Sequence, residues 1–135
     1  MTYMWSCCSL CYYFIGYYLI YLPGNVYKNT FGSSGSEMVS VFCGGIMYSF
    51  FLAKKSFFIS FTISLVGGLL ILMIGNATLS WMPVYVILAK FGISSAYCIV
   101  YAATMDLFPT LFSATAFGIC NFIACIMTIL APYLA

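Results

Sequence analysis

Long apolar runs, separated by short segments rich in proline, glycine or charge, divide the chain into five stretches. Each approaches or exceeds the ~20 residues that a helix needs to cross the hydrocarbon core of a bilayer. The pattern predicts an all-α membrane protein with about five transmembrane helices in one domain, residues 1-135. The spans are expected at about 3-21, 26-53, 57-74, 82-104 and 111-133.

Short segments rich in proline, glycine or charge mark the breaks between these spans. Pro23-Gly24 stops the first, Lys54-Lys55-Ser56 is expected to form a short basic turn, a loop follows Ile74, and Pro109 closes a turn that begins at Met105. The positive-inside rule places the lysine turn on the cytoplasmic side. With five spans, the N-terminus and the Asp106-Pro109 turn then share that side.

The second span has the weakest hydropathy signal, because Asn29 to Ser36 is rich in glycine and serine. Small residues let helices approach closely, so a packed interior helix is expected there.

Composition strengthens the membrane assignment and excludes other classes. The chain is 65% hydrophobic and only 4% charged, too few charges to make a water-facing surface. Aromatic residues make up 20% and occur in every interval, which disfavours a core piece of a larger soluble assembly. A net charge of +2 without clustered lysine or arginine argues against nucleic acid as a partner. The expected setting is an integral, multi-pass position in a lipid bilayer.

The seven cysteines do not suggest a metal centre. All fall in apolar stretches, where cysteine behaves as a small hydrophobe, and the chain contains no histidine. No motif for a catalytic triad, a zinc protease, a P-loop or a dinucleotide fold is present. We therefore expect no metal, no cofactor and no enzyme activity.

Two ionisable residues, Glu37 and Lys90, fall inside predicted spans. Charges at that depth are costly, by roughly 2.5–3.5 kcal/mol each, so they usually face a bundle interior or a water-filled cavity. They either line a substrate path or pair with one another and serve packing. Lys28 lies near a span end, from which its ammonium can reach the interface.

Five tyrosines of the first span cover more than one helical face, so some must point inward: Tyr12, Tyr13, Tyr17, Tyr18 and Tyr21. Inward rings can stack on planar solutes or hold an organic cation over their faces. Packing and interface anchoring is the alternative role for each of them.

The segment from Lys90 onward carries a family resemblance. Lys90-Phe91, Ile99-Val100-Tyr101 and Thr104-Met105-Asp106-Leu107-Phe108-Pro109-Thr110 resemble the tenth helix and following loop of the organic cation and anion transporters of the major facilitator superfamily. Thr115-Ala116-Phe117-Gly118 and the run up to Pro132 match the family's eleventh helix, with Asp106 standing for the family's glutamate.

The resemblance extends more weakly upstream, where Tyr12-Tyr13 match a tyrosine pair of the seventh helix and Glu37 follows an entry into the eighth. It implies that the five spans correspond to helices seven to eleven of a twelve-helix carrier. The chain departs from the family at three places: the charged loop after helix eight keeps only its two terminal basic residues, Ser113 replaces an arginine, and neutral Cys125 stands where cation and anion carriers differ.

Transporters of this superfamily bind their substrate between two halves and rock one against the other. We therefore expect transport of small organic solutes by a longer carrier, of which this chain is a fragment, with an N-terminal half or other membrane subunits as partners. The expected path residues are Tyr12, Tyr13, Glu37, Lys90 and Cys125, and the expected cytoplasmic gate is Asp106, Pro109 and Thr110. The alternative function is a structural or accessory subunit of a membrane complex that passes no solute.

Overall fold

The computed structural model describes residues 1–21, 26–74 and 81–134, and all of their regular structure is helical. The elements are α1 (Thr2–Tyr18), the 3₁₀ turn η1 (Leu19–Tyr21), α2 (Val26–Phe50), α3 (Ala53–Ile74), α4 (Met82–Leu107), α5 (Thr110–Thr128) and α6 (Ala131–Leu134). This confirms the all-α class. The predicted breaks at Pro23-Gly24 and after Ile74 lie outside the described residues.

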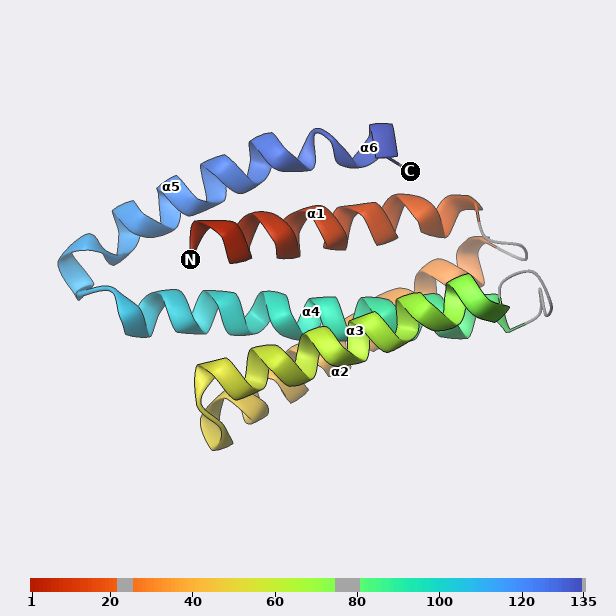
Figure 1. The fold of residues 1–135 in the computed structure, drawn as a ribbon, viewed down its shortest axis with the longest axis horizontal. Coiled ribbons are helices and arrows are strands. Elements are labelled where there is room, and N and C mark those ends of the chain that lie inside the picture. The colour runs from red at the N-terminus through yellow and green to blue at the C-terminus, as the bar shows by residue number, and fades with distance from the viewer. Residues whose placement is uncertain (22–25, 75–80, 135) are drawn as a thin grey trace.

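Helix α4 is the centre of the bundle. Helices α2 and α3 pack on one side of it, and α1 lies on the other side with α5 beyond it (Figure 1). In its most apolar window α4 is 61% buried, against 17% for α3 and for α5. The α2–α3 and α4–α5 connections lie at one end of the bundle, and the C-terminus lies at the other (Figure 1).

The surface of the bundle is apolar and much of its interior is small and polar. Phe31, Phe58 and Leu111 are largely exposed, whereas Ser40 and Ser60 are fully buried. Exposed apolar surface of this extent suits contact with lipid rather than with water. By length and composition, three of the described helices are able to cross a membrane: Ala53–Met73, Met82–Leu107 and Thr110–Tyr133.

The break between α2 and α3 lies at Phe51 and Leu52, earlier than the sequence pattern indicated. The lysines expected in a turn instead occupy the first turn of α3, since lysine is a good helix former. The backbone amide of Lys55 bonds the Leu52 carbonyl at 2.9 Å, and the Ser56 hydroxyl donates to the Met47 carbonyl at 3.1 Å. The turn is therefore shorter than predicted, and both lysines extend from a helix.

Two proline residues set the ends of the later helices. Steric contact with Pro109 disfavours a helical conformation at Phe108, which is extended (φ −105°, ψ 136°). Helix α4 therefore ends at Leu107, later than the predicted end near Thr104. Pro132 has no amide hydrogen for a helical bond, and the chain turns at Ile129 and Leu130 between α5 and α6.

Glycine allows α3 to approach α4 closely. A Cβ atom added at Gly67 would lie 2.6 Å from the Ala89 nitrogen, and one added at Gly92 would lie 2.5 Å from the Ser64 nitrogen. Real Cβ atoms do not approach backbone this closely, so both positions require glycine. This contact of small residues is the kind that drives helix association inside a bilayer.

Candidate functional site

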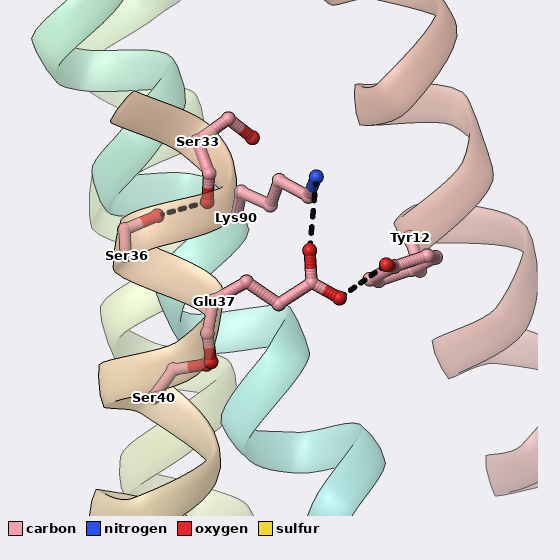
Figure 2. A network of polar contacts seen from close by, with 6 residues as sticks. All are labelled: Tyr12, Ser33, Ser36, Glu37, Ser40 and Lys90. Carbon is pink, nitrogen blue, oxygen red and sulfur yellow. Dashed lines mark hydrogen bonds and ion pairs between the residues drawn. The ribbon is translucent and has the colours of Figure 1, made fainter. Parts of the chain in front are cut away.

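Three helices meet at a polar cluster near the middle of the bundle. The Lys90 ammonium of α4 lies 3.3 Å from Oε2 of Glu37 on α2. The Tyr12 hydroxyl of α1 donates a hydrogen bond to Oε1 of the same carboxylate (Figure 2). The two ionisable residues singled out in the sequence are thus paired with each other, and Tyr12 joins them.

The cluster is largely withdrawn from the surface. The Lys90 side chain is 11% exposed and the Glu37 side chain 31% exposed. Nζ of Lys90 also lies 5.3 Å from the centre of the Tyr12 ring, which is within range of a cation–π contact. Tyr12 therefore contacts the anion through its hydroxyl and the cation through its ring.

Serines on α2 surround the pair without competing for it. Ser36 and Ser40 donate to carbonyls of their own helix, those of Ser33 and Glu37 (Figure 2). The buried hydroxyls of Ser33 and Ser94 have no protein partner in the structure. Most buried polar groups in proteins have a hydrogen-bond partner. Ser33 lies one helical turn from Glu37 and Ser94 one turn from Lys90, so both hydroxyls are available to bond a further group close to the pair.

An aromatic chain leads from the polar cluster into the contact between α1, α4 and α5. Tyr12 lies edge-on to Tyr13 at 5.4 Å and beside Tyr97 at 5.6 Å. Tyr97 in turn packs against Tyr101 at 5.3 Å and Trp5 at 6.0 Å. Tyr97 was not singled out from the sequence, although its spacing of seven residues from Lys90 places both on one face of a helix.

A cavity of about 540 Å³ opens beside this aromatic chain, between α1 and α5. Its polar lining comes from hydroxyl, amide and thiol groups: Ser9, Tyr13, Tyr17, Tyr97, Asn121, Cys125, Thr128 and Tyr133. Tyr13 and Cys125, both predicted as path residues, lie here. Ser9, Asn121 and Thr128 were missed, because an uncharged polar residue within an apolar helix gives little signal in one sequence.

The predicted path residues thus divide between two neighbouring places. Tyr12, Glu37 and Lys90 form the polar cluster, whereas Tyr13 and Cys125 line the cavity. Tyr97 belongs to both, because its ring contacts Tyr12 and also lines the cavity.

The predicted gate residues lie at the end of the bundle that holds the α2–α3 and α4–α5 connections (Figure 1). Oδ2 of Asp106 accepts a hydrogen bond from the Tyr48 hydroxyl of α2 at 2.5 Å. Pro109 precedes α5, and Thr110 is its exposed first residue. Asp106 therefore joins α2 to α4, while Pro109 and Thr110 begin the next helix.

A second cavity, about 650 Å³ and almost entirely apolar, lies between α1, α3 and α4. Leu10, Phe14 and Tyr18 form its wall on α1, and Gly68 and Val86 lie opposite. The lining carries no charged side chain, so it is unsuited to a charged solute. Among the described residues, no group of three or more His, Cys, Asp or Glu is placed to hold a metal.

Comparison with known proteins agrees with the resemblance found in the sequence. The chain is 29% identical over 132 residues to mouse (Mus musculus) solute carrier family 22 member 4 and 26% identical over 132 residues to mouse organic cation/carnitine transporter 2. It is 28% identical over 135 residues to putative transporter B0252.3 of Caenorhabditis elegans. No family model matches the chain, and no solved structure matches it significantly.

These matches cover 96% to 100% of the chain but only 23% to 27% of each relative. The chain spans about a quarter of the length of the relatives that it matches. The resemblance to organic cation/carnitine transporters is confirmed, and the protein is an integral, multi-pass membrane protein related to transporters.

Proposed function

We propose that this chain forms part of the solute path of a transporter for small organic solutes, and that its five long helices correspond to helices seven to eleven of a twelve-helix carrier. The observation that carries the proposal is the polar cluster of Tyr12, Glu37 and Lys90 beside an aromatic, uncharged cavity. A partly buried charge pair at bilayer depth, next to a cavity large enough for a small molecule, is typical of a transport site.

The chemistry of the two places suits an organic solute. Tyrosine faces and hydroxyls at Tyr13, Tyr17 and Tyr97 offer stacking and hydrogen bonds, and Asn121 offers both a donor and an acceptor. The Glu37 side chain remains 31% exposed, so a solute group is able to approach it. Segments outside this chain would close the path, whether on the same polypeptide or on another.

The gate proposal rests on the contact between Tyr48 and Asp106. This bond ties α2 to α4 at the end where the predicted cytoplasmic turns meet, so it holds these two helix ends together as one side of the proposed gate. Pro109 fixes the direction in which α5 leaves that end.

A chimeric carrier tests the function directly. The matched segment of mouse organic cation/carnitine transporter 2 is replaced by this chain, and carnitine uptake is measured in cells after surface expression has been confirmed. Retained uptake supports the proposal. A chimera that reaches the surface but carries no solute, in either this host or mouse solute carrier family 22 member 4, contradicts it.

Asn121 and Phe122 provide a matched pair of variants. Asn121 lines the cavity, whereas its neighbour Phe122 is 68% exposed on the outside of α5. Asn121→Leu should lower uptake efficiency roughly tenfold, the equivalent of one lost hydrogen bond to solute, and Phe122→Leu should leave it unchanged. Equal effects would show that the cavity is not the path.

The alternative function, a non-transporting accessory subunit, is favoured by one specific observation. Glu37 and Lys90 neutralise each other, as a pair that serves only packing would do. If the pair serves only packing, replacing Glu37 by Gln together with Lys90 by Met would leave the uptake of an active chimera intact, whereas a path role for the pair predicts loss of that uptake.

A further inference from the structure

The described helices fall into two packing units. In the α2–α3–α4 unit, α4 packs along α2 and α3; in the α1–α5 unit, α1 packs along α5. Figure 1 shows α1 and α5 together on one side of α4, with α2 and α3 on the other. Helices α4 and α5 are consecutive in sequence, yet they touch little beyond their connection.

The α2–α3–α4 unit is held by close backbone contacts. Gly67 and Gly92 leave no room for a Cβ atom, and one at Gly44 would lie 3.0 Å from Oγ of Ser95. The Ser60 hydroxyl donates to Ser95 across α3 and α4 at 3.2 Å. Backbones in such contact cannot slide without clashing, so this unit should behave as one body.

The α1–α5 unit has small residues and short polar bonds of its own. Ser9 and Thr128 share a hydrogen bond at 3.1 Å, and Thr2 lies 3.4 Å from Sγ of Cys120. Ala124 is fully buried in the same contact.

Helix α1 also packs on α4 along the boundary between the two units, which we call the seam; small buried residues such as Cys8 and Ala96 lie in it, and long side chains cross it at two places. At the end nearest the α4–α5 connection, the indole of Trp5 donates to Thr104 at 3.0 Å, and its ring lies 4.7 Å from Tyr101. Halfway along, Tyr12 reaches Glu37 and Lys90 (Figure 2). Long side chains can reorient while the backbones behind them stay intact.

The far end of the seam is loosely filled. The apolar cavity of about 650 Å³ lies there, between residues 10–18 of α1, α3, and the first turns of α4. Beyond the cavity, buried Leu19 and Val86 close the seam, and Ile15, Tyr18, Ile71 and Met82 pack against them. The seam is therefore interrupted by this cavity between Tyr12 and Leu19.

We propose that the α1–α5 unit pivots against the α2–α3–α4 unit about the Trp5 end of the seam, with the hydrogen bond from Tyr12 to Glu37 as the latch. Phe108 and Pro109, which lie outside both helices, connect the two units at the pivot. The proposal concerns motion within the described helices, so it does not depend on whether the protein transports a solute.

This motion is tested by measuring distances between pairs of spin-labelled amino acids. The labels are introduced genetically into the full chain, which is then placed in lipid nanodiscs. Ile20 and Leu69 are exposed and report across the seam at its loose end; Tyr3 and Met105 report across it at the pivot end. In Tyr12→Phe, which removes only the latching hydroxyl, we expect the first distance to shift or broaden by about 2 Å or more. The second distance should stay as in the unmodified chain.

A matched control separates the latch from a general loss of order. Tyr48→Phe also removes a tyrosine hydroxyl bonded to a carboxylate, but within the α2–α3–α4 unit. It should leave the Ile20 to Leu69 distance unchanged. The distance from Val39 to Leu69, inside one unit, should not respond to either variant.

Tyr12→Leu, which removes the ring facing Lys90 as well, should give a larger shift than Tyr12→Phe. An unchanged Ile20 to Leu69 distance in both Tyr12 variants would overturn the proposal. Equal shifts at the two ends of the seam, or a shift inside the α2–α3–α4 unit, would overturn it as well, because a pivot moves one end only.

Discussion

The carboxylate of Glu37 on α2 lies 3.3 Å from the ammonium of Lys90 on α4, and these two residues are separated by 53 positions in the sequence. The pair joins two helices that also meet where Gly44 approaches Ser95 and where Tyr48 bonds Asp106. It has consequences for stability that do not depend on any transport role.

Removing one partner of this pair should destabilise the protein more than removing both. Glu37→Gln leaves the Lys90 charge 11% exposed and without its counter-ion, at an expected cost of about 1–3 kcal/mol. The double variant Glu37→Gln, Lys90→Met should recover part of that loss. Thermal unfolding in detergent measures both, and a double variant less stable than Glu37→Gln would contradict the role of the uncompensated charge.

The adjacent glycines of α3 should respond in opposite ways to the same substitution. Gly67→Ala places a methyl group against the backbone of Ala89, and overpacking of this kind costs typically 1–3 kcal/mol. Gly68→Ala meets nothing within 4 Å and gains helix propensity, so the variant should be unchanged or up to about 1 kcal/mol more stable. Equal unfolding temperatures for the two variants would show that the α3–α4 contact is looser than described.

The bond between Trp5 and Thr104 should show measurable coupling. Thr104→Val leaves the buried indole donor unpaired and should cost about 1–3 kcal/mol. Trp5→Phe also loses that bond, so adding Thr104→Val to Trp5→Phe should cost clearly less. A double-mutant cycle by chemical unfolding gives the coupling energy, and additive effects would mean that the bond contributes nothing.

Sidedness can be measured at two exposed positions. Lys55 lies in the first turn of α3 and Thr110 begins α5, and both helices start at the same end of the bundle (Figure 1). A cysteine at either position should therefore react with an impermeant thiol reagent from the same, cytoplasmic, side. Buried Cys8 and Cys120 serve as internal unreactive positions. Labelling of Lys55→Cys and Thr110→Cys from opposite sides would refute the proposed topology.

The described helices α1 to α5 lie near the apolar stretches seen in the sequence, and three of them are long and apolar enough to cross a membrane. Their ends were less predictable. The charges of Lys54 and Lys55 indicated a turn, but both residues lie in the first turn of α3. Pro109 and Pro132 were more informative, because proline restricts the backbone locally and its effect on a helix end can be predicted from sequence. The motifs at residues 90–133 also indicated a resemblance to organic cation transporters, and the two mouse relatives confirm that resemblance.

The sequence predicted only part of the candidate site. Glu37 and Lys90 stood out because charge is rare in an apolar chain, but the sequence left open whether they pair; the structure joins them and adds Tyr12. Tyr97, Asn121 and Thr128 gave no comparable signal, since an uncharged polar residue on a helix gains meaning only from what faces it across the bundle.

By itself, then, the sequence determined that the chain is a helical membrane protein related to organic solute carriers, because hydropathy, charge scarcity and a local motif are properties of contiguous residues. Only the tertiary structure decided which helices pack together, which tyrosine of five joins the ion pair, and where the cavities lie. Those features depend on helix rotation and on the close approach of small residues, such as Gly92 to Ser64, between segments far apart in the chain.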